Sequence, residues 1–261
     1  MARVLSALVL LPIVITTIWW LPPLATLALA EIVVVLAFAE YAGLVARLGA
    51  RLPVAVTGSG VVVACAALAL GGSEAHVVLM VATIVVGSIT VGMGRRGAEA
   101  LQDVSAALFA LLYLGLPLGA LVAIRVEGGR EVLLLLLACV MTSDTAQYYG
   151  GRAFGRRALA PAISPKKTVE GAVAGLVAGT LAMVVIGEWW LPAVGPAGRA
   201  LLGATVVGLG LMGDLFESGL KRSAGVKDTS SVIPGHGGVL DRVDSLLFAT
   251  PFYYMVVRYG A

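Results

Sequence analysis

Long apolar runs, separated by short polar breaks, cover almost the whole chain. A helix needs about 20 mostly apolar residues to cross the hydrocarbon core of a bilayer. By this criterion the pattern predicts nine membrane-spanning helices. They cover roughly residues 4–20, 24–46, 54–71, 76–93, 103–124, 131–149, 168–188, 200–220 and 243–259. The breaks between them contain the glycine and proline residues that favour turns.

The first apolar run has two interpretations. Arg3 precedes it and the sequence ALA at 28–30 resembles a cleavage site, as in a secretory signal peptide. However, the runs 4–20 and 24–46 flank Pro22 and Pro23, and proline interrupts helices. We therefore expect a helical hairpin bent at these two prolines.

The composition indicates an integral membrane protein. Of the 261 residues, 59% are hydrophobic and 13% are charged, and the mean hydropathy is +0.99. A soluble domain carries about a quarter charged residues, because its surface must be covered by polar groups. The expected fold class is therefore all-α and polytopic, with the lipid bilayer as the main surroundings. Cys65 and Cys139 lie in apolar runs and are expected to be packing residues, and a net charge of +3 is too small to indicate nucleic acid.

The basic residues predict the orientation. If the loops are numbered alternately, 14 of the 18 Lys and Arg residues fall on one side. Because cytoplasmic loops carry the excess of positive charge, the N-terminus is expected in the cytoplasm. The basic loops 150–167 and 221–242 then face the compartment that contains nucleotides and magnesium. In the first of these loops, Ser164 or Thr168 is expected to cap the following helix, with Glu170 in its first turn.

Acidic residues gather at the predicted cytoplasmic ends of the last four spans. They are Asp144, Glu170, Asp214, Glu217, Asp228, Asp241 and Asp244. Helical spacing places Asp214, Glu217, Ser218 and Lys221 on one face, and Asp241, Asp244 and Ser245 on another. Salt bridges to neighbouring Lys and Arg residues would explain part of this pattern. The number of carboxylates at one depth favours a divalent cation with oxygen ligands.

Two further carboxylates, Glu31 and Glu40, belong to the second predicted span. An ionisable residue in a span is a functional candidate by default. We expect an interhelical hydrogen bond or an interfacial position for both.

A glycine-punctuated stretch, residues 221–245, concentrates both signs of charge. Its segment PGHGG (234–238) has glycine backbone that can approach a ligand closely and point N–H groups at an anion. Positive charge on either side comes from Lys221, Arg222, Lys227 and Arg242. His236 is equally compatible with donating to a phosphate and with bracing the loop. The P-loop motif is absent from the sequence.

The stretch SGLKRSAGVKDTSSVIPGHGGVLDRVD (218–244) resembles the signature of the phosphatidate cytidylyltransferase (CDP-diacylglycerol synthase) family. The segments SDTAQYYGGRAFGRR, SPKKTVEG and GDLFES are also similar to that family. The resemblance is strong over roughly 140–250, and the N-terminal half matches mainly in hydropathy. One departure is Thr229 and Ser230, where a Ser-Gly pair is common in the family.

The resemblance implies that CTP and phosphatidate react to give CDP-diacylglycerol and pyrophosphate, with one or two Mg²⁺ ions. The metal ligands it implies are Asp214 and Asp241 first, then Asp144 and Asp244. The implied catalytic residues are Asp144, Lys167, Asp214, Lys221, Asp241 and Asp244. The implied phosphate-binding residues are Lys166, Arg222, Lys227, Gly235, His236, Gly237, Gly238 and Arg242.

The resemblance also implies a homodimer in the cell membrane, with the active site on the cytoplasmic side. Residues 1–125 would form a scaffold and lipid pocket, and residues 126–261 would carry the catalytic site. Two alternatives remain at this point. The first is a related enzyme that uses CTP, either a cytidylyltransferase with another lipid phosphate acceptor or a lipid kinase. The second is a transporter. Transport is disfavoured because the charges gather at one membrane face without an evident internal repeat.

Overall fold

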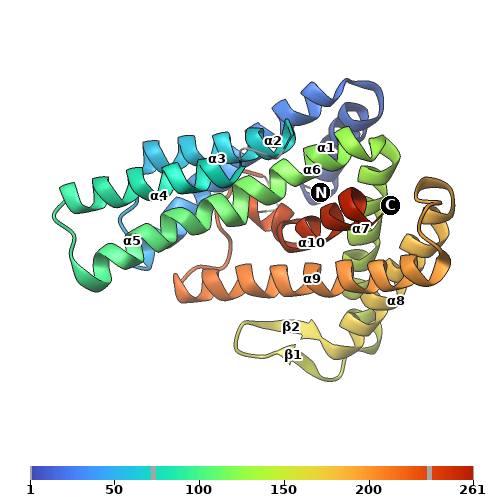
Figure 1. The fold of residues 1–261 in the computed structure, drawn as a ribbon. Helices are drawn as coiled ribbons and strands as arrows, with labels where there is room; N and C mark the ends of the chain where they lie inside the picture. Colours follow the sequence, from blue (N-terminus) through green and yellow to red (C-terminus); the bar gives the residue numbers. More distant parts are fainter. Residues whose placement is uncertain (1, 72–74, 234–236, 261) are drawn as a thin grey trace. The chain divides into compact units, whose positions relative to one another are not determined.

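The computed structural model describes residues 2–71, 75–233 and 237–260, with side chains from residue 8 onward in the first range (Figure 1). These residues form an all-α polytopic fold with one small β-hairpin. The chain divides into two compact units. Unit 1 contains Met1–Ala123 and Ser223–Arg242, and unit 2 contains Ile124–Arg222 and Val243–Ala261. The expected division of roles between residues 1–125 and 126–261 remains a prediction.

Unit 1 is built from the N-terminal helices. They are α1 (Ala2–Trp20), α2 (Pro23–Arg47), α3 (Val54–Ala69), α4 (Ala75–Gly92), α5 (Gly97–Ala110), the π-helix η1 (Leu111–Gly115) and the start of α6 (Leu116–Glu127). The break between α1 and α2 falls at the two prolines, because Pro22 precedes the helix and Pro23 opens it with a fixed φ.

Unit 2 contains α7 (Gly129–Phe154), α8 (Val169–Trp190), α9 (Pro196–Ser223) and most of α10 (Leu240–Tyr259). Between α7 and α8 the chain forms an antiparallel hairpin of β1 (Ala158–Ala160) and β2 (Ser164–Thr168). The sequence analysis expected only a basic loop here. Two strands of three and five residues, one of them rich in lysine, do not show the alternating apolar pattern that predicts a strand.

Each of the nine predicted spans coincides with a helical segment to within a few residues in the described ranges. Six of the described helical segments are long and apolar enough to cross a membrane: α2, α4, the continuous α5–η1–α6 segment, α7, α8 and α9. Helix α3 and the described apolar part of α1 are shorter. The protein is therefore a multi-pass membrane protein, whereas the total of nine spans and the orientation remain predictions.

The long helical segment α5–η1–α6 changes its hydrogen-bonding pattern in its middle. The π-turn Leu111–Gly115 is followed by Pro117, which has no backbone N–H to donate one turn back. The side chains of Tyr113 and Leu114 are buried at this point. Tyr41 of α2 donates from its hydroxyl to the carbonyl of Ala106 at 2.8 Å, which joins α2 to the same segment.

Helices α7 and α8 pack through glycine. Gly171, Gly175 and Gly179 lie one turn apart on α8, and all three are buried. A Cβ on Gly171 would lie 2.7 Å from the carbonyl oxygen of Gln147, and a Cβ on Gly179 would lie 3.1 Å from that of Cys139. The two backbones therefore touch, as helices do in lipid when small residues face each other. This contact fixes the C-terminal half of α7 against the start of α8.

A buried polar network joins the end of α4 to α5. Asp103, which is fully buried, accepts hydrogen bonds from Arg95 Nε at 2.7 Å and from the backbone N–H of Arg51 at 2.8 Å. The hydrogen bond to Asp103 raises the pKa of Arg95 above its ordinary value. The same arginine pairs with Glu99, whose side chain is 65% exposed.

We expect Asp103→Ala to lower the midpoint of thermal unfolding in detergent by several degrees. The substitution leaves Arg95 and the Arg51 amide without their buried acceptor, and unmatched buried polar groups are costly. Glu99→Ala is the control, because it removes an exposed partner of the same arginine and such pairs contribute little. Equal losses for the two variants, measured by intrinsic tryptophan fluorescence, would contradict this account.

Candidate active site

Four carboxylates of unit 2, contributed by three helices, lie near one another. They are Asp144 of α7, Asp214 and Glu217 of α9, and Asp244 of α10, and we call them the acidic cluster. The Asp244 carboxylate interacts electrostatically with those of Asp214, Glu217 and Asp144. The structure therefore brings together three of the four predicted metal ligands.

Close packing of α9 on α10 produces this proximity. A Cβ on Gly213 would lie 2.5 Å from the carbonyl oxygen of Asp244, so the two helix backbones are in contact there. Asp214 follows directly in the sequence, and Glu217 lies one turn later on α9. A single glycine thus allows carboxylates from two helices to occupy the same region.

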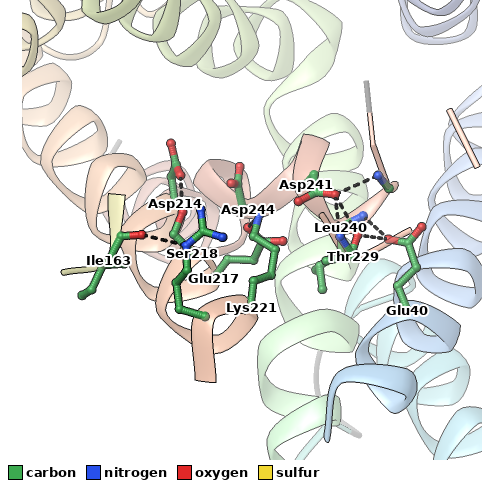
Figure 2. A network of polar contacts seen from close by, with 12 residues as sticks. Glu40, Ile163, Asp214, Glu217, Ser218, Lys221, Thr229, Leu240, Asp241 and Asp244 are labelled. Atoms are coloured by element: carbon green, nitrogen blue, oxygen red, sulfur yellow. Dashed lines mark hydrogen bonds and ion pairs between the residues drawn. The ribbon is translucent and has the colours of Figure 1, made fainter. Parts of the chain in front are cut away.

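Two lysines form ion pairs within the cluster. Lys167 of β2 pairs with Asp214. Lys221 pairs with Glu217 one turn before it on α9, and both of these residues are labelled in Figure 2. Glu217 is fully buried and Lys221 nearly so, which makes this pair part of the interior. Ser218 donates to the other oxygen of Asp214 at 3.3 Å. Because each lysine is paired with a carboxylate, the cluster contains both negative groups that can bind a cation and positive groups that can bind an anion.

The β-hairpin that carries Lys166 and Lys167 is anchored at several points. Thr168 caps α8, because its hydroxyl accepts from the Gly171 N–H at 3.1 Å. Of the two predicted caps, Ser164 and Thr168, the second is therefore confirmed. Glu170 accepts from the backbone N–H groups of Arg156 at 3.0 Å and Arg157 at 3.2 Å. At the hairpin turn, Arg222 Nε donates to the carbonyl of Ile163 at 3.2 Å. The hairpin is thereby attached to both α8 and α9.

A second polar group lies in unit 1 and involves the segment 226–240, which we call the glycine loop. Asp241 lies in the first turn of α10, and its Oδ2 atom accepts three hydrogen bonds (Figure 2). Two come from Thr229, from the backbone N–H at 3.1 Å and from the hydroxyl at 2.8 Å, and the third comes from the N–H of Gly238 at 2.8 Å. This predicted metal ligand belongs to a different unit from the acidic cluster. One of its oxygens braces the loop.

Glu40 of α2 bonds to the same loop. It accepts from Thr229 Oγ1 at 2.9 Å, Ser230 Oγ at 2.6 Å, Val239 N at 2.9 Å and Leu240 N at 2.8 Å. The sequence analysis treated Glu40 as a functional candidate by default and expected an interhelical hydrogen bond or an interfacial position for it. No local signal could have paired it with residues about 190 positions later in the chain.

The glycines of the loop have identified roles where they are described. A Cβ on Gly238 would lie 1.9 Å from Thr229 Oγ1 and 2.4 Å from Glu40 Oε2, so no side chain fits at this position. Gly237 has a φ of +83°, which favours glycine. The N–H of Gly238 donates to Asp241, so in this arrangement it serves the loop itself. Gly235 and His236 lie outside the described residues.

The remaining predicted phosphate-binding residues are on the surface. Lys166, Arg222, Lys227 and Arg242 are all exposed. Glu217, by contrast, was noticed as sharing a helix face with Asp214 but was not included among the site residues. Its spacing of three from Asp214 and four from Lys221 was the available signal.

The donor chemistry of the acidic cluster fits a hard divalent cation. Carboxylate oxygens are the ligands of Mg²⁺, which uses one or two carboxylates and completes its shell with water and substrate phosphates. Across the part of the chain that the structure describes, no three His, Cys, Asp or Glu side chains form a ready-made metal cage.

Comparisons with known proteins agree with the motif resemblance. A sequence model of the cytidylyltransferase family matches residues 1–260. Phosphatidate cytidylyltransferases of Synechocystis and Haemophilus influenzae are 48% and 45% identical to this chain over 132 and 129 residues. These matches cover 49% and 48% of this chain, and 44% and 45% of the relatives. The Escherichia coli protein YnbB, described as uncharacterised, is 41% identical over 138 residues, which are 52% of this chain and 45% of that protein. The chain thus spans about half the length of these curated relatives.

We expect Gly238→Ala to lower the thermal midpoint of the purified protein, because the new Cβ would overlap Thr229 Oγ1 and Glu40 Oε2. Gly208→Ala is the matched control. Position 208 lies within α9 and has no atom within 4 Å of an added Cβ, so alanine should leave stability unchanged or raise it through helix propensity. If Gly238→Ala is as stable as wild type, Gly238 does not pack closely against Thr229 and Glu40 as described above.

Proposed function

Because the chain belongs to the cytidylyltransferase family, we propose that it transfers the cytidylyl group of CTP to phosphatidate, forming CDP-diacylglycerol and pyrophosphate at the membrane. The names of its relatives from Haemophilus influenzae and Synechocystis support phosphatidate as the acceptor. The observation that carries the proposal is the acidic cluster with its two lysines, since it offers groups for phosphate and for a cation in one region.

The reaction is a substitution at phosphorus. A phosphate oxygen of phosphatidate attacks the α-phosphorus of CTP, and the bond from that phosphorus to the oxygen bridging to the β-phosphate breaks in line. Pyrophosphate leaves with the bonding electron pair. The attacking phosphate is already anionic near neutral pH, so the site does not require a strong general base. Its main task is to bring two polyanions together, which positive groups accomplish.

In this proposal Lys167 and Lys221 bind phosphate oxygens. Their ion pairs with Asp214 and Glu217 hold the two ammonium groups in place before substrate arrives. Arg222 is already oriented by the Ile163 carbonyl, and we propose that its guanidinium, a group with five N–H donors, contributes to phosphate binding. The exposed Lys166, Lys227 and Arg242 would add positive charge that attracts the nucleotide.

We further propose that Mg²⁺ is the cofactor, with Asp144, Asp214 and Asp244 of the acidic cluster as ligands. Asp241, a ligand by the motif resemblance, is proposed to be required for Mg²⁺-dependent activity. When bound, the ion would neutralise charge on the phosphates and on the leaving pyrophosphate. Crowding of four carboxylates in unit 2 supports this choice, because a divalent cation relieves their mutual repulsion.

The proposed reaction takes place on the cytoplasmic side, where CTP is available. The excess of Lys and Arg on one side of the predicted topology supports this orientation. The homodimer remains an expectation from the family resemblance, and light scattering of the detergent-solubilised protein would test it.

We expect purified protein with phosphatidate, Mg²⁺ and CTP labelled at the α-phosphorus to yield a labelled lipid. CTP labelled at the γ-phosphorus should label only pyrophosphate. Lipid labelled from the γ-position would identify a lipid kinase and refute the proposal. Transfer from the α-position to another lipid phosphate, with phosphatidate unreactive, would correct the acceptor while retaining the reaction type. Chelation of Mg²⁺ by EDTA should stop the transfer.

Asp214→Asn should reduce kcat/KM by at least about 100-fold, since even the outer partners of a metal contribute about 10–100-fold. The substitution removes one charge of the acidic cluster and the partner of Lys167. Glu188→Gln is the control, because it makes the same chemical change at an exposed position of α8 in the same unit. Near wild-type activity of Asp214→Asn at low Mg²⁺ would reject Asp214 as a ligand.

A further inference from the structure

The Glu40 carboxylate joins both ends of the glycine loop. Its donors are Thr229 and Ser230 before the loop tip, and Val239 and Leu240 after it. Between these donors, the N–H of Ile233 donates to the carbonyl of Gly237 at 2.9 Å. Both ends are thus held by one side chain from a helix that lies far away in the sequence.

The same carboxylate completes the N-terminus of α10. The first N–H groups of a helix lack intrahelical acceptors, and a side chain of the preceding residue usually supplies one. Val239 precedes α10 and has no polar side chain. Glu40 accepts from the N–H groups of Val239 and Leu240 instead, and its negative charge is favourable at this end of the helix.

Glu40 and Asp241 are linked through Thr229. The hydroxyl of Thr229 lies 2.9 Å from Glu40 Oε2 and 2.8 Å from Asp241 Oδ2. A hydroxyl has one proton, so it donates to one of these carboxylates at a time. Gly238 packs against Glu40 and donates its N–H to Asp241. Any displacement of Glu40 therefore changes the groups that hold Asp241.

Burial makes Glu40 difficult to replace. The residue is 8% exposed and lies in a helix apolar enough to cross the membrane, where a carboxylate is costly unless it is matched by donors. Glu40 also lines a cavity of about 580 Å³, together with Arg47, Asp228 and Val232. A shift of the loop would therefore also change a space that a ligand can enter.

From these contacts we propose that Glu40 is a positioning residue. It holds the glycine loop and the start of α10 so that Asp241 is in place for the nucleotidyl transfer, an inference that rests on the proposed function. Glu40 acts through Thr229, Gly238 and the α10 N-terminus and does not itself touch the reacting atoms.

The test compares Glu40→Gln with Glu31→Gln. Glutamine has the size of glutamate, but its NH₂ group would face two of the donors that now bond to the carboxylate. Glu31 lies on the same helix nine residues earlier, outside the contacts to the loop described above. Hydrogen exchange read by mass spectrometry reports the loop, and steady-state kinetics with CTP, phosphatidate and Mg²⁺ reports the reaction.

We expect Glu40→Gln to speed hydrogen exchange of residues 226–240 by at least about tenfold while α8 and α9 keep their wild-type rates. Because a misplacement of about 1 Å can cost on the order of 10²-fold in rate, kcat/KM for CTP should fall at least about tenfold, and half-maximal activity should require more Mg²⁺. Glu31→Gln should match wild type in both measurements. If Glu40→Gln does not fold, Ser230→Ala is the alternative, because it removes one of the donors to Glu40. We then expect smaller changes in the same direction, both in loop exchange and in kcat/KM.

Unchanged exchange in the loop would overturn the proposal. Faster exchange with wild-type kinetics would also overturn it, because Glu40 would then be a structural brace without a positioning role. A wild-type protein that does not turn over CTP with phosphatidate would refute the proposed function, and with it the kinetic role of Glu40. The exchange experiment would still decide whether Glu40 holds the loop.

Discussion

A carboxylate among apolar helices is stable only where donors or cations compensate it, and this requirement organises the polar parts of the molecule. Three buried carboxylates meet it in different ways. Asp103 is matched by an arginine and a backbone N–H, Glu217 by a lysine one turn later, and Glu40 by two hydroxyls and two backbone N–H groups. The contacts of Asp103 and Glu40 join separate segments of the chain, whereas the pair of Glu217 and Lys221 lies within α9.

Glycine determines where these compensated charges can meet. Apolar side chains gain little from packing on each other in lipid, so helices associate where small residues let their backbones touch. The glycines of α8 bring α7 close, and Gly213 brings α9 onto α10. Because Asp144 and Asp214 lie near these contacts, the packing that joins the helices also gathers the acidic cluster.

The two units use charge for different purposes. In unit 2, carboxylates and lysines form ion pairs. The pair of Lys167 and Asp214 is partly accessible, whereas the pair of Lys221 and Glu217 is buried. In unit 1, the carboxylates of Glu40 and Asp241 accept mainly from backbone N–H groups and hydroxyls of one loop. Such contacts fix a conformation.

The sequence by itself determined the helices and the family to which the chain belongs. A long apolar run in a bilayer has to satisfy its backbone internally and so becomes a helix. The sequence offered Ser164 and Thr168 as caps of α8, and the structure shows Thr168 in this role. The acidic residues that share a helix face were also readable, since 3.6 residues make one turn. Only the tertiary structure decided the β-hairpin, the burial of Glu217 and the bonds of Glu40 to the glycine loop. Those features depend on segments up to 200 residues apart, and no local period in a sequence reports which distant segments pack together.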